Sequence, residues 1–200
     1  MTIIRHESSS DMLVQFQDEH AAIVHTTYSN FLNGHVKNPY DISVFGVGYL
    51  GEGVYMSKIS GKSTPEYLMW MSMLQRCYSE KWKLKFPAYY GICSVCNEWL
   101  NFQNFAKWYH SHYYETSERL HLDKNILIPG NTLYSPDTCV LVPQRINMLF
   151  TGRNKADIMD IRYAEHIRHI ADEYRNIIPM YVYDALIRRT LCANKHQNDK

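Results

Sequence analysis

The segment RLHLDKNILIPGNTLYSPDTCVLVPQRIN, residues 119–147, contains the residue types that can hold a divalent cation and activate water. Asp123 follows a short extended stretch, Asn131 lies in a Gly-Asn turn, and Asn147 comes where a helix is expected to begin. Carboxylate and amide oxygens are Mg²⁺ ligands, and a neighbouring base can take a proton from water. The pattern indicates metal-assisted phosphodiester hydrolysis, provided that two strands and a helix bring these groups together.

Each of these polar residues also has a purely structural interpretation. His121 lies between two leucines, where a histidine is often simply packed or solvent exposed. Asn131 after Gly130 is typical of a turn. Asn147 could cap the segment that follows it. The sequence leaves these alternatives open.

Four cysteines form a second group with metal-binding potential. Cys93 and Cys96 have the C-x-x-C spacing of a zinc knuckle, and Cys77 and Cys139 could supply two further thiolates. A second C-x-x-C pair is missing, and small buried cysteines need no metal. Zinc is therefore the weaker metal hypothesis, and Mg²⁺ is the cofactor that we expect.

Basic and aromatic residues between positions 76 and 108 form the third group. Cations contact phosphates and aromatic rings stack on bases, so this mixture suits nucleic-acid binding, although a run of charges is often only a solvated face. The candidate DNA-binding residues are Arg76, Lys81, Lys83, Lys85, Lys107 and Trp108.

The sequence predicts an α+β fold that would position these residues. It comprises a small irregular sheet and a ββα finger over 123–147, packed on several helices. Helices are predicted over 64–82, 101–114 and 157–192, with Asn101 as one cap and Pro179 as an interruption. A further helix is predicted to begin at Ser10 and to end near Gly34. Three parts are expected: an N-terminal helical arm (1–40), a core domain (41–150) and a C-terminal helical pair (151–200).

Composition excludes several classes of protein. The 200 residues include 21 Lys and Arg against 20 Asp and Glu, which excludes both a polybasic nucleic-acid binder and an acidic DNA mimic. No apolar run approaches the roughly 18–20 residues that span a membrane. Five cysteines without a secretory signal favour a reduced cytoplasmic protein.

Several motifs resemble those of the phage HNH-type (His-Me finger) homing endonucleases. They are MLQRCY at 73–78, YYGICSVCNEWLNFQNFAKW at 89–108, LDKNIL at 122–127, GN at 130–131, YSPDTC at 134–139 and the closing Asn147. The resemblance implies a phage protein acting on double-stranded DNA in the cytoplasm of an infected bacterium. It also implies a catalytic centre that includes His121, Asp123 and Lys124, with Asp123, Asn131 and Asn147 as candidate Mg²⁺ ligands.

Two departures from that family leave its activity in doubt. Many relatives carry a three-stranded DNA-reading sheet of the ethylene-response type after the closing asparagine, and this chain has no room for it there. In the register that makes Asp123 the metal ligand, Lys124 occupies the place of the general-base histidine and Thr138 lies near the second metal ligand. A shifted register makes His121 the base but places Leu120 at the ligand position. The finger is therefore expected to be degenerate.

Three functions remain open from the sequence. The first is a metal-dependent DNA endonuclease, and the second is a catalytically inactive relative that still binds nucleic acid. The third is a non-enzymatic phage protein that binds and modulates a host or anti-phage defence protein. The near-zero net charge and the additional N-terminal segment favour the third.

Overall fold

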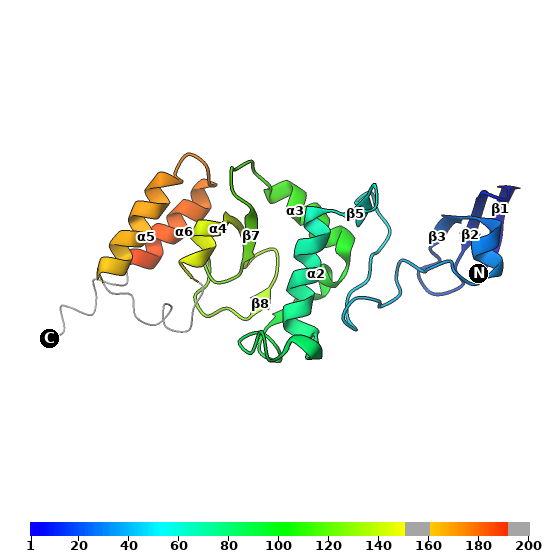
Figure 1. The fold of residues 1–200 in the computed structure, drawn as a ribbon, viewed down its shortest axis with the longest axis horizontal. Coiled ribbons are helices and arrows are strands. Elements are labelled where there is room, and N and C mark those ends of the chain that lie inside the picture. The colour runs from blue at the N-terminus through cyan, green and yellow to red at the C-terminus, as the bar shows by residue number, and fades with distance from the viewer. Residues whose placement is uncertain (151–160, 192–200) are drawn as a thin grey trace.

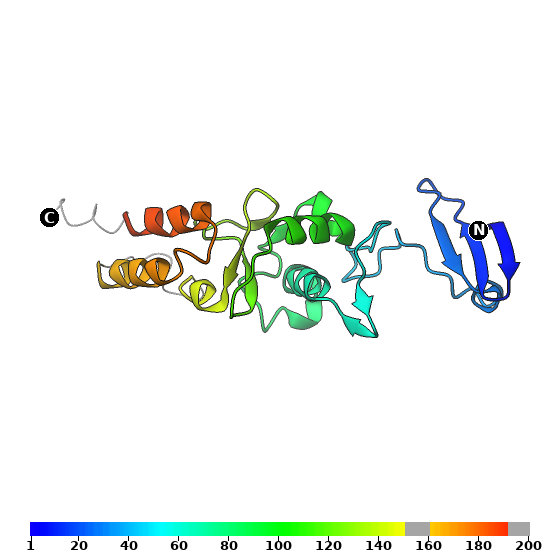
Figure 2. The same cartoon turned by 90° about the horizontal axis from the view of Figure 1, so that it is seen from above.

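The computed structural model describes residues 1–150 and 161–191, which form an elongated molecule with distinct ends (Figure 1). A three-stranded sheet lies at one end and two paired helices, α5 and α6, lie at the other. The central part contains helices α2 and α3 and the small strands β7 and β8 (Figures 1 and 2). Six helices and several small sheets confirm the predicted α+β class.

The N-terminal residues form a sheet, so the helix predicted over 10–34 is wrong. Strands β1 (Thr2–Ser8), β2 (Asp11–Gln15) and β3 (Ile23–Thr26) pair as an antiparallel meander, and only the short helix α1 (Tyr28–Leu32) follows. In β2 the buried residues are Met12 and Val14, two positions apart, which is the period of a strand. The chain from Ser10 to Gly34 is thus divided among two strands, the turns between them and this short helix.

Two helices build the central core as the sequence predicted. Helix α2 (Pro65–Tyr78) begins with proline in its first turn, and α3 (Phe102–His112) is capped by Asn101, whose side chain accepts a hydrogen bond from the Gln103 N–H. The Trp70 indole N–H donates to the Trp99 carbonyl at 2.7 Å. The core residues between these helices are fully buried: Trp70, Met73, Leu74, Trp99, Phe102 and Phe105.

Short elements complete this central region. Strands β4 (Lys58–Ile59) and β5 (Lys62–Ser63) form a hairpin before α2. The 3₁₀ helices η1 (Glu80–Trp82) and η2 (Asn97–Leu100) follow α2 and precede α3. Strand β6 (Ser94–Val95) pairs in parallel with β8 (Leu133–Tyr134) and so connects this region to the finger.

A ββα unit lies between the two ends of the molecule. Strand β7 (Leu120–Asp123) pairs antiparallel with β9 (Val140–Pro143), and α4 (Gln144–Met148) follows directly. All four residues of β9 are buried. Leu141 belongs to the core of α2 and α3, whereas Val140 and Val142 belong to a second core.

The second core joins the ββα unit to the C-terminal helices. Helices α5 (Ile161–Glu173) and α6 (Met180–Leu191) lie side by side (Figure 2). Their buried residues, including Ile167, Ile170 and Leu186, pack with Ile146 of α4. The helix predicted from 157 is described from Ile161 onward, and residues 157–160 and Cys192 lie outside the described residues. The core therefore crosses the predicted boundary at residue 150.

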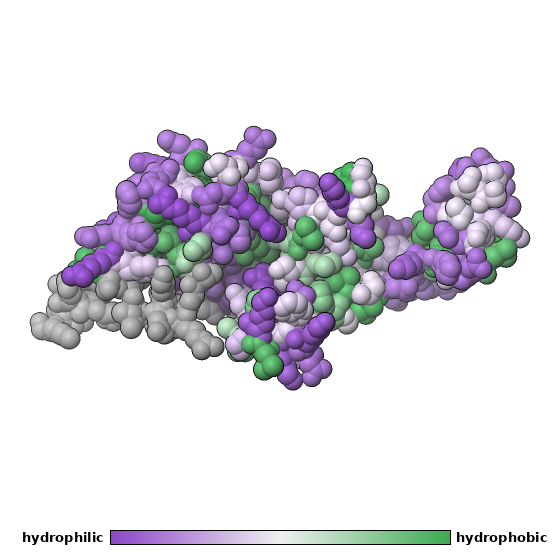
Figure 3. Space-filling model, in the orientation of Figure 1, coloured by the Kyte–Doolittle hydropathy of each residue, from purple (hydrophilic) through white to green (hydrophobic). Residues whose placement is uncertain are grey.

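The visible surface is mostly hydrophilic, with hydrophobic residues in separate patches (Figure 3). Among residues 1–150 and 161–191, no helix is both long and apolar enough to cross a membrane.

Trp70 tests the importance of the contact between α2 and the Trp99 segment. Trp70→Ala should lower the free energy of unfolding by about 3–5 kcal/mol, because it removes a fully buried indole and leaves a cavity. Urea denaturation measures this change. The control Leu84→Ala removes a side chain that is 89% exposed and should change stability by less than about 0.5 kcal/mol. Equal losses in the two variants would contradict the assignment of Trp70 to the core.

Candidate functional site

Two adjoining cavities lie along α2 and β7. The larger, of about 220 Å³, we call the arginine cavity. The smaller, of about 50 Å³, we call the Asp123 cavity. Both are lined by Arg76, Leu122 and Asn147. The arginine cavity is completed by Met69, Ser72, Arg119, Leu120 and His121, and the Asp123 cavity by Tyr89, Asp123, Lys124, Asn125, Tyr134 and Phe150.

Local structure explains why these side chains meet. Met69, Ser72 and Arg76 follow at intervals of three and four residues, so they share one face of α2. Arg119 and His121 are two residues apart around the start of β7, as expected for side chains on one face of an extended chain. The β7–β9 pairing then places α4, and with it Asn147, against the same space.

The arginine cavity is cationic. Arg76 stacks on the rings of Tyr89 and Tyr134, with its guanidinium carbon 5.2 and 5.6 Å from their centroids. Its Nε also donates to the Ser72 carbonyl, which holds the side chain along α2. Arg119 is exposed at the other side of the cavity. None of the described residues that line this cavity is acidic.

His121 contributes an uncharged imidazole to this wall. Burial lowers the pKa of His121 below its usual 6.5, and the positive charges of Arg119 and Arg76 lower it further, against a smaller opposing effect of Glu118. The ring is therefore neutral at pH 7. Its Nε2 is buried and has no hydrogen-bond partner, which is an uncommon state for a buried polar atom.

Asp123 is buried and holds the turn that follows β7. Its Oδ1 accepts hydrogen bonds from the N–H groups of Asn125 (2.6 Å) and Ile126 (2.7 Å). Burial raises the pKa of this carboxyl, and the two N–H donors and the nearby Lys124 oppose the rise. Because the folded state then holds the proton more tightly, the contribution of Asp123 to stability falls as the pH rises from 3.8 through the raised pKa.

Lys124 fills the position next to Asp123. The side chain is buried, and its ammonium donates to the Asn131 carbonyl and to Asn125 Oδ1 (3.1 Å). It also lies 5.7 Å and 5.9 Å from the ring centroids of Tyr89 and Tyr134. Lys124 thus lines the same cavity as the predicted metal carboxylate, with its ammonium held by Asn131 and Asn125.

The arrangement around Asp123 does not fit a resident magnesium ion. Mg²⁺ needs several oxygen ligands in near-octahedral geometry, and a second cation nearby repels it. Here one carboxylate oxygen already accepts two backbone bonds, and the positively charged Lys124 is the next residue and lines the same small cavity. Asn147 also lines that cavity, and its side-chain amide has no hydrogen-bond partner among the described residues.

Asn131 serves the turn, which is the alternative that the sequence left open. Its amide nitrogen donates to the carbonyls of Lys124 (3.0 Å) and Leu133 (2.6 Å), and its oxygen accepts from the Leu133 N–H (3.1 Å). Asn131 lines neither of the two cavities described here.

The four cysteines contribute to the core around Tyr134. Cys77, Cys93 and Cys139 are buried, and Cys96 is partly buried. Burial raises the pKa of the thiols of Cys77 and Cys139 to about 12, so in the metal-free protein they are protonated at neutral pH. Within residues 1–150 and 161–191, no three side chains of His, Cys, Asp or Glu are grouped to hold a metal ion.

The predicted basic and aromatic surface is only partly assembled. Trp108 is 7% exposed and packs against Trp99, with ring centroids 4.7 Å apart, so the prediction that it stacks on bases is wrong. Lys107 is exposed on α3. Of the lysines after α2, Lys83 lies 3.3 Å from Glu80, and the Lys85 ammonium lies 4.4 Å from the centroid of Trp82. Lys81 is exposed in the same segment.

Sequence reasoning missed Arg119 and Ser72. Arg119 could have been found, because it is two residues before His121 in a stretch predicted to be extended and so had to share its face. Ser72 could have been found from its spacing of four residues to Arg76 on a predicted helix.

The role of Asp123 in the turn can be tested by two substitutions. Asp123→Asn keeps an oxygen that can accept from the N–H groups of Asn125 and Ile126, whereas Asp123→Ala leaves both donors without an acceptor. Asp123→Ala should therefore cost about 1–3 kcal/mol more in unfolding free energy than Asp123→Asn. Asp137→Ala, at an exposed position of the same segment, is the control and should be nearly neutral. Equal losses for the two Asp123 variants would show that the negative charge matters more than the acceptor.

Known proteins do not assign a role to these residues. No protein-family model matches the chain, no curated protein sequence matches it, and no solved structure matches its fold. The resemblance to HNH-type endonucleases therefore stays a prediction from the motifs in residues 73–147. The residues that line the two cavities are therefore the basis for proposing a function.

Proposed function

We propose that this protein binds double-stranded DNA through the arginine cavity, as a catalytically degenerate relative of the HNH-type endonucleases. One observation carries the proposal: Arg76 and Arg119 line a single cavity with Asn147 and a neutral His121, without an acidic residue among the described lining. Guanidinium groups match the geometry of a phosphate and bind it through paired hydrogen bonds. The cavity is thus suited to a backbone phosphate.

The surrounding groups support a phosphate at this position. The Asn147 amide supplies N–H donors, and among the described residues nothing else engages it. Ser72 lines the same cavity and adds a hydroxyl donor. Because phosphate contacts position a protein on DNA without reading its sequence, this site predicts binding with little sequence preference.

Cleavage is the part of the ancestral activity that the geometry disfavours. A lysine takes the place of the expected general base, and its ammonium donates to the Asn131 carbonyl and to Asn125 Oδ1. The carboxyl of Asp123 is committed to the turn through Asn125 and Ile126. We therefore propose binding without hydrolysis.

Binding can be measured by fluorescence anisotropy with a labelled 20-base-pair duplex at several salt concentrations. Arg76→Ala and Arg119→Ala should each weaken binding about tenfold, because each removes a phosphate contact. For the same reason, each should reduce by about one the steepness with which the logarithm of the binding constant falls with the logarithm of the salt concentration. Arg5→Ala is the matched control, since Arg5 is half-exposed in the sheet at the far end of the molecule, and it should leave the affinity unchanged (Figure 1).

Absence of salt-dependent binding by the wild-type chain would refute the proposed function. The hypothesis that the chain binds a host or anti-phage defence protein would then take precedence.

A separate experiment addresses hydrolysis. Supercoiled plasmid incubated with the protein and either Mg²⁺ or Mn²⁺ should stay supercoiled over hours, because Asp123 is bonded to the turn and the positively charged Lys124 lines the cavity beside it. Agarose electrophoresis detects a single nick. Nicking that disappears in both Asp123→Ala and His121→Ala would contradict the degenerate centre and establish an endonuclease.

A further inference from the structure

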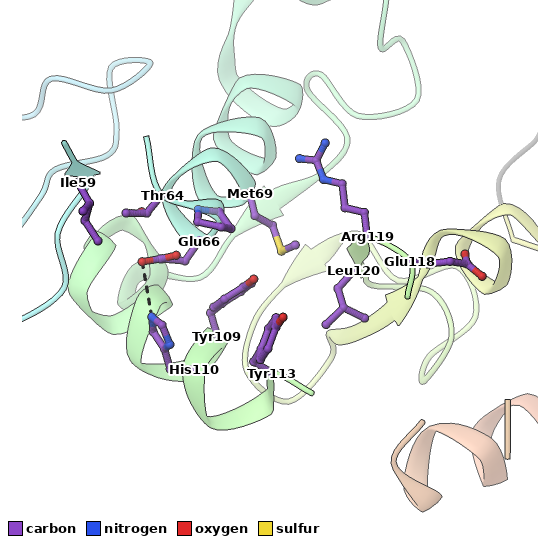
Figure 4. Close-up of a pocket in the computed structure, with 11 residues that line it drawn as sticks. Ile59, Thr64, Glu66, Met69, Tyr109, His110, Tyr113, Glu118, Arg119 and Leu120 are labelled. Carbon is purple, nitrogen blue, oxygen red and sulfur yellow. Dashed lines mark ion pairs between the residues drawn. The ribbon is translucent and has the colours of Figure 1, made fainter. Parts of the chain in front are cut away.

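A third cavity, of about 460 Å³, opens between the start of α2 and the end of α3 (Figure 4). We call it the Glu66 pocket. Glu66 and Met69 reach it from α2, Tyr109 and His110 from α3, and Tyr113 from the residue after α3. Its size and partly apolar lining are typical of a small-molecule site, and Glu118 and Arg119 also line it.

The polar group at the centre of this pocket is a buried carboxylate. Glu66 is 7% exposed, and its only ionic or hydrogen-bonding partner among the described residues is His110 Nε2, at 3.5 Å (Figure 4). A carboxylate has room for about four hydrogen bonds and only accepts them. Glu66 therefore retains most of its accepting capacity on the wall of this pocket.

Aromatic rings line the pocket beside this carboxylate. The rings of Tyr109 and Tyr113 have centroids 5.7 Å apart, and Figure 4 shows both on the same side of the pocket, opposite Met69. Burial raises the pKa of Tyr109 to about 12, so its hydroxyl stays protonated at neutral pH. Tyr113 is 51% exposed, so one face of its ring is accessible for stacking.

The Glu66 pocket and the arginine cavity share one wall. Met69, Arg119 and Leu120 line both. Along α2 the sequence Glu66, Met69, Ser72, Arg76 runs from one cavity to the other over about 15 Å, at 1.5 Å per residue. A carboxylate with aromatic rings therefore lies at one end of a continuous groove, and two guanidinium groups lie at the other.

From this juxtaposition we propose that the Glu66 pocket binds a guanine base, with the phosphate of the same nucleotide held at Arg119. Of the nucleic-acid bases, guanine presents two adjacent N–H donors, the ring N1–H and the 2-amino group, to a single carboxylate. Adenine and cytosine present only an amino group beside a ring acceptor, which an ionised carboxylate repels. Tyr113 stacks on the base, as aromatic side chains do in single-strand binding sites.

This inference rests on the proposed DNA-binding function, since Arg119 serves both sites. Two kinds of ligand present an unpaired guanine to the pocket: a free nucleotide and an unpaired nucleotide in a DNA strand. The base must be unpaired, because a paired base would have to leave the helical stack to enter the pocket.

Isothermal titration calorimetry with guanosine 5′-monophosphate tests the proposal. Inosine 5′-monophosphate, which lacks the 2-amino group, and adenosine 5′-monophosphate should both bind at least tenfold more weakly to the wild-type chain. Glu66→Gln should weaken guanosine monophosphate binding at least tenfold and remove its preference over inosine monophosphate. The matched control Glu80→Gln changes a 77% exposed glutamate after α2 and should leave binding unchanged.

A second variant keeps the test decisive if Glu66→Gln does not fold. Tyr113→Ala removes a half-exposed ring and should weaken the guanosine and inosine nucleotides by the same factor, because it removes stacking only. Equal affinity of the wild-type chain for the three nucleotides, or an effect of Tyr113→Ala on one of them alone, would overturn the proposal.

The source of the guanine is decided with two duplexes that differ in one unpaired base. If free nucleotides do not bind, a duplex with one bulged guanine should still bind at least tenfold more tightly than the same duplex with a bulged adenine. If neither form of guanine is preferred while paired duplex binds, this inference fails and the proposed function stands. If guanosine monophosphate binds with the expected selectivity while paired duplex does not, the proposed function fails and the pocket stands.

Discussion

The pairing of β7 with β9 is the constraint on which the central and C-terminal parts of the molecule depend. Strand β9 is buried along its whole length, because Leu141 packs into the core of α2 and α3 while Val140 and Val142 pack into the core of α5 and α6. A one-residue slip would exchange these two sets of side chains between the two cores. The same pairing sets β7 in register, and so it determines where Arg119, His121 and the turn at Asp123 lie.

The sequence predicted the helical core well because local signals and burial agreed there. Pro65 in the first turn of α2 and the Asn101 cap of α3 are strong start signals, and the apolar residues between them had a single way to be buried. The ββα unit was also predicted, since the turn residues around Gly130 separate two short extended stretches rich in aliphatic residues.

The N-terminal sheet was missed for an equally physical reason. Short strands interrupted by turns place apolar residues at irregular intervals, and such intervals can imitate an imperfect helical stripe over a long window. The alternation within β2, in which Met12 and Val14 are buried and Leu13 is not, spans only five residues. Whether so short a segment forms a strand depends on the strands that pair with it, and its own sequence does not show them.

The candidate site was likewise predicted only in part from the sequence. Residues that neighbour one another in sequence, such as His121, Asp123 and Lys124, could be recognised as a group, but their orientations could not. Hydrogen bonds from Asn125 and Ile126 commit Asp123 to the backbone, and the buried ammonium of Lys124 closes the space beside it. Trp108 shows the opposite error, because an aromatic residue among lysines looks available for stacking until the fold turns it toward Trp99.

Different faces of helix α2 pack in the core and line the cavities. Trp70, Leu74 and Cys77 face the core, whereas Met69, Ser72 and Arg76 line the cavities along an adjacent arc. Substitutions at Ser72 and Arg76 therefore change what the groove accepts while the buried arc stays as it is. During evolution, mutations at these two or three positions can therefore change the ligand that binds, while selection for stability acts separately on the residues of the buried arc.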